Sequence, residues 1–159
     1  MIRQPNLEFL RRAIALATEN VTSGRGGPFA ALIAREGKVI AEGVNMVTAT
    51  NDPTAHGEVT AIRAACKVLK TFTLAGCELY TSCEPCPMCL AASHWARLEA
   101  VFFGASAEDA AKAGFDDAYL YEEFRKDPAD RSLSAKQFLR DEAWTSFAAW
   151  IDSPSKVDY

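Results

Sequence analysis

Hydrophobic residues recur at helical spacing in three separate parts of the chain. Residues 7–21 carry one apolar stripe, and the glycine-rich segment 23–28 ends this predicted helix. A second stripe predicts a helix from about Ala55 to Lys70, and a third predicts a helix within the tail segment 141–151. Each predicted helix also has a polar face, so its apolar face needs a surface to pack against.

Short apolar runs of strand-forming residues lie between the helices. Residues 29–34 and 38–43 flank a short turn and predict a β-hairpin, while residues 77–83 and 99–105 predict two further strands. The segment 85–98 is helical in character. This alternation favours a mostly parallel sheet, with the hairpin supplying an antiparallel edge. The expected fold class is α/β, a three-layer α/β/α arrangement with a mixed central sheet.

The rest of the chain is expected to contribute little core. Residues 116–134 are charged and contain a proline, which predicts a surface loop with one helical piece. The chain has 159 residues, of which 49% are hydrophobic, and this is enough for one substantial core. We therefore expect a single domain over residues 1–159.

Composition narrows the classes of partner. A formal net charge of -4 and a pI near 5.2 disfavour nucleic acid and anionic membranes and favour a small molecule. No apolar run approaches the ~20 residues that cross a bilayer, and the first residues lack the features of a secretion signal. Five cysteines, three of them within SCEPCPMC, indicate metal binding rather than a disulfide framework. We expect a cytoplasmic protein.

Three residues form a candidate metal site. Cys86 and Cys89 are three positions apart at a predicted helix start, so both thiols can reach one ion. His56, at the start of the preceding predicted helix, is the third candidate ligand. Two thiolates and an imidazole select zinc over magnesium or calcium. Three protein ligands leave the fourth position of a tetrahedral site open for water, which is the arrangement of catalytic zinc.

Glu58 decides between a catalytic and a structural interpretation of this site. It follows His56 by two residues, and the two can share a site at the irregular first turn of their helix. Cys83 lies three residues before Cys86 and could instead close the site as a fourth ligand that only stabilises the fold. A glutamate that reaches the open position favours catalysis, with one zinc ion per subunit and Cys83 packed at a strand end.

The two metal-binding segments carry a family resemblance. They match the H-x-E and P-C-x-x-C signature of zinc deaminases through His56-Gly57-Glu58 and Pro85-Cys86-Pro87-Met88-Cys89. The sequence resembles the cytidine deaminase superfamily over nearly its whole length. Its segments GGPF, TNDPTAHGEVTAIRAAC, YTSCEPCPMC and AGFDDAYLY most resemble the small bacterial guanine deaminases. The resemblance implies a cytidine deaminase-like fold and the hydrolysis of guanine to xanthine and ammonia.

The resemblance also implies roles for single residues. Glu58 is expected to carry protons between water, the ring nitrogen and the departing amine. Asn45 and Asp117 occupy positions of substrate contacts, and Asp117 is also expected to help the amine leave. Phe29 is expected to stack on the purine ring. On residue type alone, a turn for Asn45, a helix cap for Asp117 and core packing for Phe29 are the commoner roles.

Further expectations concern the helix start and the end of the chain. Backbone amides of Gly57 and of the first turn of each helix that carries a metal-binding motif are expected to hold the substrate, and His56 and Gly57 are both expected to contact it. Gly57 replaces the alanine usual in these guanine deaminases, so we expect local flexibility or a slightly larger pocket floor. The resemblance further implies a homodimer that exchanges the C-terminal segment, about residues 140–159, so that Tyr159 covers the pocket of the neighbouring subunit.

Two other functional classes fit part of this pattern. tRNA adenosine deaminases carry the same zinc motifs, but their polyanionic substrate demands clustered Lys and Arg, whereas this chain is acidic. Cytosine or another amino-substituted heterocycle also stays open as a substrate. The non-enzymatic alternative is a zinc-stabilised binding module with Cys83 as the fourth ligand.

Overall fold

The structure, a computed structural model, describes residues 4–158. It divides into two compact units, of which the first ends at Tyr121 and the second begins at Glu122, within helix α6. The elements that begin in the first unit are α1 (Leu7–Thr22), β1 (Ala30–Arg35), β2 (Lys38–Val44), α2 (Val47–Thr50), α3 (Gly57–Leu69), β3 (Cys77–Cys83), α4 (Pro87–Trp95), β4 (Ala100–Ala105), α5 (Ala107–Lys112) and α6 (Asp117–Arg125).

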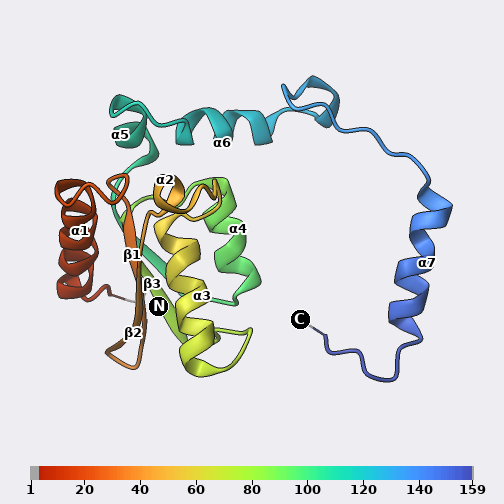
Figure 1. The fold of residues 1–159 in the computed structure, drawn as a ribbon, viewed down its shortest axis with the longest axis horizontal. Helices are drawn as coiled ribbons and strands as arrows, with labels where there is room; N and C mark the ends of the chain where they lie inside the picture. The colour runs from red at the N-terminus through yellow and green to blue at the C-terminus, as the bar shows by residue number, and fades with distance from the viewer. Residues whose placement is uncertain (1–3, 159) are drawn as a thin grey trace. The chain divides into compact units, whose positions relative to one another are not determined.

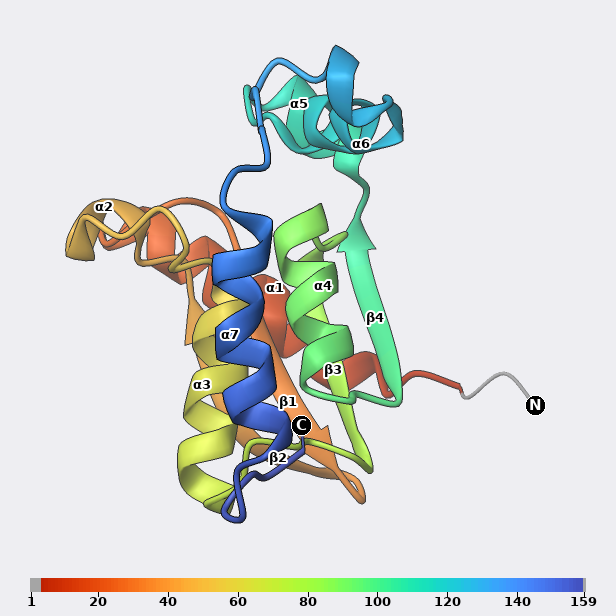
Figure 2. The ribbon, with the colours of Figure 1, turned by 90° about the vertical axis from the view of Figure 1, so that its right-hand side faces the viewer.

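The sheet of the first unit has the strand order β2-β1-β3-β4. Helix α1 covers one face, and helices α3 and α4 cover the other, as Figures 1 and 2 show. The three-layer α/β/α class with a mixed sheet is thus confirmed. The predicted hairpin is confirmed as well, because β1 and β2 pair antiparallel around a turn at Glu36 and Gly37, both with positive φ.

The expectation of a mostly parallel sheet was wrong. Strand β1 pairs antiparallel with both β2 and β3, and only β3 and β4 pair parallel. The helical crossovers do join strands that run in the same direction, since β2 and β3 are both antiparallel to β1. The hairpin, however, places β1 between β2 and β3. The antiparallel strand is therefore an interior strand of the sheet and not an edge strand.

Two layers of core lie on opposite faces of β1. Ala31 and Ile33 pack with Ala61 and Ala65 of α3, whereas Leu32 faces α1 together with Phe9, Leu10 and Tyr80, and all of the strand from Ala30 to Ala34 is buried. This alternation follows from the period of two along a strand. Small alanine side chains allow α3 to approach the sheet closely.

Two glycines hold the start of α3 against the sheet. A Cβ added at Gly43 of β2 would lie 2.3 Å from the Ala61 nitrogen and 2.5 Å from the Gly57 oxygen, and one at Gly57 would lie 2.9 Å from the Ala30 Cα. All of these neighbours are backbone atoms, so a rotamer change cannot relieve the overlap. The absent side chain of Gly57 therefore leaves room for the close approach of β1 in this chain.

Replacement of Gly43 by alanine is expected to destabilise the fold. The new methyl group forces α3 away from β2, and overpacking of this kind costs about 1–3 kcal/mol of unfolding free energy. Urea unfolding of Gly43→Ala measures the effect, with Lys38→Ala on the exposed end of the same strand as the control. Equal midpoints for the two variants would show that α3 tolerates the shift.

The second unit contains the end of α6, the 3-10 helix η1 (Pro128–Asp130) and α7 (Arg140–Ile151). Glu123 organises its loop by accepting hydrogen bonds from the Ser132 backbone nitrogen and hydroxyl, both at 2.8 Å, and it pairs with Lys126. These partners, of which Lys126 has the largest effect, lower the pKa of the Glu123 carboxyl group to about 2. The predicted tail helix is confirmed as α7.

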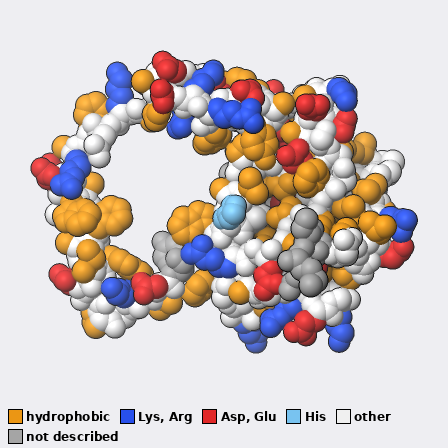
Figure 3. All heavy atoms as spheres, turned by 180° about the vertical axis from the view of Figure 1, so that it is seen from behind, with side chains coloured by type: hydrophobic (Ala, Val, Ile, Leu, Met, Phe, Trp, Pro, Cys, Tyr) orange, Lys and Arg blue, Asp and Glu red, His pale blue; other side chains and the backbone are white. Residues whose placement is uncertain are grey.

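Helix α7 buries none of its residues in the part of the chain described. Its exposed apolar side chains include Trp144, Phe147 and Ile151, and hydrophobic surface along this segment is visible in Figure 3. An apolar helix face without cover is typical of an interaction surface. Among residues 4–158, no helix has the length and apolar character needed to span a membrane.

Candidate active site

The first residues of helices α3 and α4 lie at the same edge of the sheet. His56 is the N-cap of α3, which follows β2 and the short helix α2, and Cys86 is the N-cap of α4, which follows β3. Because β2 and β3 run in the same direction, the chain leaves both at the same edge. This edge, outside the carboxyl ends of the strands, is where α/β proteins commonly bind ligands.

The three predicted ligands lie together. The Sγ atoms of Cys86 and Cys89 are each 3.6 Å from the His56 Nδ1, and the three donor atoms lie within 4.8 Å of one another. Tetrahedral zinc with the usual bond lengths separates a nitrogen ligand from a sulfur ligand by about 3.6 Å. The spacing and the chemistry of these donors therefore fit zinc.

Local backbone conformation brings these donors together. His56 and Cys86 both have extended N-cap backbones, and neither side chain makes a capping hydrogen bond to its own helix, so both side chains are available to the metal cluster. Pro87 occupies the first position of α4, where a missing N–H costs nothing. The helix thus begins two residues later than Pro85, and Cys89 reaches the same point from the first turn.

The charge state of the cluster is set by contacts among its members. A hydrogen bond with Cys89 lowers the pKa of Cys86, and the same contact raises the pKa of Cys89. The hydrogen bond to Cys86 raises the pKa of His56 in spite of burial. A thiolate is thus favoured at Cys86, and thiolate is the form that binds metal.

Glu58 lies buried beside this cluster, with 4% of its surface exposed. Its Oε1 atom is 3.3 Å from the Thr81 hydroxyl, and its Oε2 atom accepts a hydrogen bond from Cys89 at 3.4 Å. Burial raises the pKa of this carboxyl group, because the charged form loses its hydration. A raised pKa brings a carboxyl group closer to the range in which it can both accept and donate a proton.

Cys83 points to a different part of the molecule. Its thiol contacts the Ser106 carbonyl at 3.5 Å, and burial raises its pKa to about 11. The cluster of possible metal ligands found in the described residues contains His56, Cys86 and Cys89 without Cys83. This geometry favours an open three-ligand site over the closed alternative.

A cavity of about 220 Å³ opens beside the cluster. Its lining contains the predicted residues Phe29, Asn45, His56, Glu58, Cys86 and Asp117, together with Gly27, Val47, Thr48, Glu84 and Phe115. The rings of Phe29 and Phe115 meet edge to face, with their centroids 4.7 Å apart. The lining therefore combines the carboxyl groups of Glu58, Glu84 and Asp117 with the aromatic pair Phe29 and Phe115.

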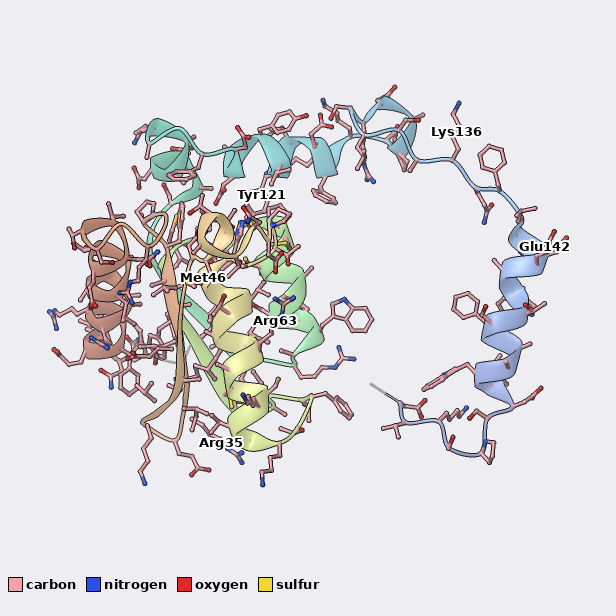
Figure 4. All side chains as sticks on the ribbon, viewed as in Figure 1. Arg35, Met46, Arg63, Tyr121, Lys136 and Glu142 are labelled. Carbon is pink, nitrogen blue, oxygen red and sulfur yellow. The ribbon has the colours of Figure 1, made fainter. Side chains whose placement is uncertain are left out.

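Asp117 is the first residue of α6 and lines the same cavity. Desolvation raises its pKa, and the nearby Cys86 acts in the same direction. The hydroxyl of Tyr121, one turn further along α6, donates a 2.6 Å hydrogen bond to the Pro85 carbonyl. Figure 4 labels Tyr121 at this point, near the amino end of α4. This bond ties the helix that carries Asp117 to the segment that carries Cys86.

The sequence analysis did not select several of these residues. Glu84 and Phe115 lie within the quoted segments YTSCEPCPMC and AGFDDAYLY, so the resemblance could have pointed to them, whereas Val47 and Thr48 carry no signal. Gly57 does not appear in the cavity lining, and Ala30 fills the space beside its Cα. The structure therefore does not have the larger pocket floor that we expected from this glycine. Tyr159 lies outside the described residues.

Residues 3–105 match the family model of the cytidine and deoxycytidylate deaminase zinc-binding region. The match covers more than half of the chain and includes both metal-binding segments. The chain therefore belongs to this family.

Within the family, this chain is similar to guanine deaminases over nearly its full length. It is 54% identical to guanine deaminase of Bacillus subtilis over 95% of this chain and 97% of that protein. The crystal structure of guanine deaminase from the same organism superposes with a TM-score of 0.93 and 52% identity, covering 98% of this chain and 99% of that one. The tRNA-specific adenosine deaminase of Aquifex aeolicus is 43% identical, over 61% of this chain and 64% of that protein.

Proposed function

We propose that this protein is a zinc-dependent guanine deaminase that hydrolyses guanine to xanthine and ammonia. The observation that carries the proposal is a buried carboxylate, Glu58, beside a cluster of three metal-binding side chains at the floor of a small cavity. The similarity to guanine deaminase over nearly the full length of both chains supports the same substrate.

In this proposal His56, Cys86 and Cys89 hold one zinc ion. The chemistry that zinc supplies when bound is the activation of water for attack on carbon. Glu58 accepts one proton of the attacking water and delivers it to the ring nitrogen, and it then carries the second proton, from the hydroxyl group on C2, to the departing amine. A C–O bond forms at C2 of guanine, the bond between C2 and its exocyclic nitrogen breaks, and ammonia leaves. Burial suits Glu58 to this exchange because it raises the pKa of its carboxyl group.

The remaining lining side chains fit recognition of a purine. Guanine offers N–H donors along its N1 and N2 edge and acceptors at O6, N7 and N3, so a selective site needs an acid and an amide. Asp117, Asn45 and Phe29 all line the cavity. We assign Asp117 and Asn45 to these polar contacts and Phe29 to stacking on the base. Asp117 lies in the same cavity as Glu58 and is assigned to assist the amine as it leaves. The backbone N–H of Gly57, at the first turn of α3, is assigned to hold the base, whereas the His56 nitrogen already donates to the Thr54 carbonyl at 2.8 Å.

The cavity size favours a free base over a nucleotide or an RNA loop. Its volume of about 220 Å³ is below the roughly 300–1,000 Å³ of pockets for drug-sized ligands. The excess of acidic residues also disfavours a polyanionic substrate. Ammonia release should therefore be fastest with guanine in a comparison with adenine, cytosine and a tRNA anticodon stem-loop. Release from the stem-loop alone would support the adenosine deaminase alternative.

We further propose a homodimer in which the C-terminal segment, about residues 140–159, crosses to a second copy and places Tyr159 over its cavity. The uncovered apolar face of α7 supports this proposal.

All five cysteines are free thiols, which fits a protein that works in the reducing cytoplasm.

Light scattering tests the dimer. The intact chain is expected at twice the monomer mass of 17.3 kDa, and Trp144→Asp with Phe147→Asp is expected to reduce it to the monomer. Tyr121→Phe, which leaves α7 intact, is the matched control. A monomeric intact chain contradicts the exchange.

A further inference from the structure

The amide of Asn20 is wholly buried at the C-terminal end of α1. Its Nδ2 atom donates two hydrogen bonds of 2.9 Å, one to the Gly27 carbonyl and one to the Asn45 carbonyl. Gly27 and Asn45 both line the cavity; Gly27 lies before β1 and Asn45 directly after β2, at the open end of the β-hairpin. One side chain thus joins two parts of the cavity wall.

The backbone of the same residue adds to this connection. The Asn20 carbonyl accepts hydrogen bonds from the Arg25 and Gly26 nitrogens, at 3.0 and 3.3 Å. The Asn45 nitrogen donates to the Phe29 carbonyl at 2.9 Å. Asn20 therefore contacts the loop before Phe29 and the residue that pairs with Phe29.

The space around the amide is closed on all sides. A Cβ at Gly26 would lie 2.9 Å from the Asn20 Nδ2 and 2.4 Å from the Asn45 oxygen, so only glycine lets the loop reach this position. The Asn20 Oδ1 atom has no hydrogen-bond partner within the described part of the chain. A buried polar group that is only half satisfied is a poor source of stability, because its desolvation is not fully compensated. Its two strong bonds both go to the cavity wall, which points to a role in shaping that wall.

We propose that Asn20 is a positioning residue for substrate binding, which fixes the wall formed by Gly27, Phe29 and Asn45. The proposal rests on the proposed function, since this wall is the one assigned to the purine ring. The hydrogen bonds of Asn20 in the described part of the chain go to neither Glu58 nor the residues of the metal cluster. Its loss should therefore affect the binding of the base and leave the proton-transfer machinery in place.

Two variants separate the loss of the hydrogen bonds from the loss of volume. Asn20→Leu removes both donors and fills the space, and Asn20→Ala removes both donors and leaves a void. Each variant is expected to raise KM for guanine at least about fivefold, because the free energy of two lost hydrogen bonds is large enough for such a change. The value of kcat should stay within twofold of the wild type, and the zinc content should be unchanged. Calorimetric titration of guanine into the same variants carrying Glu58→Gln should show a matching rise in Kd.

Phe9→Leu is the matched control. Phe9 lies on the same helix and packs edge to face on Tyr80, away from the cavity. It should lower Tm without changing KM. Should Asn20→Leu and Asn20→Ala not fold, Asn20→Ser carries the same prediction with a smaller change in packing.

The outcomes distinguish the two proposals. A wild-type protein that neither binds nor deaminates guanine overturns the proposed function and with it this role for Asn20. A wild-type protein that does so, with variants of unchanged KM, overturns the positioning role alone. A loss of stability with equal changes in kcat and KM, as for a general packing defect, also overturns it.

Discussion

Replacement of Glu58 by glutamine is expected to abolish almost all turnover while zinc remains bound. Glutamine keeps the shape of the side chain but cannot accept the proton of water, and general acid-base groups contribute about 10²–10⁴-fold to rate. Because two proton transfers depend on this one residue in the proposed reaction, we expect kcat to fall by about 10³-fold or more. Steady-state ammonia release and zinc analysis of the same sample measure both quantities.

Cys83→Ala is the control for this experiment. Cys83 contacts Ser106 and lies outside the metal cluster, so its removal should leave zinc content and turnover nearly unchanged. A loss of zinc in Cys83→Ala, with Glu58→Gln still active, would establish the closed structural site and refute the proposed chemistry.

The second large effect is expected from removal of a metal ligand. Cys89→Ala takes away one of three donors and should lose both zinc and activity, with Tm lowered, because metal that binds only the folded chain stabilises it. Chelation of zinc from the wild-type protein should have the same effect, reversed by added zinc. Differential scanning calorimetry with and without chelator measures the change.

Cys66→Ala controls for the loss of a thiol in general. Cys66 packs against the core from α3 and is not a member of the metal cluster. Unchanged zinc content and full response to chelator are expected in this variant. If Cys89→Ala instead retained stoichiometric zinc, the proposed ligand set would be wrong.

Periodicity predicted the elements well because each depends on local patterns. The stripe over residues 55–70 became α3, and the hairpin formed around the predicted turn. The short helix α2 was missed, since four residues cannot show a period. The direction of β3 relative to β1 was also missed, because pairing between distant strands leaves no trace in the spacing of either strand.

The candidate site was predicted from motifs rather than from patterns of burial. His56, Glu58, Cys86 and Cys89 belong to two short segments with distinctive chemistry. Thr81 beside Glu58 has no such signal, because a threonine in a strand is usual for the strand itself. The sequence could not reveal this contact, which depends on how closely α3 approaches β3.

The amino-acid sequence by itself determined which residues can bind metal and move protons, because soft thiolates, imidazole and carboxylate are properties of side chains. Tertiary structure decided which cysteines take part, by turning Cys83 toward Ser106 and bringing Cys86 and Cys89 to His56. It also placed Asn20 between Gly27 and Asn45. Such contacts join residues far apart in the chain, so they arise only when the helices pack on the sheet.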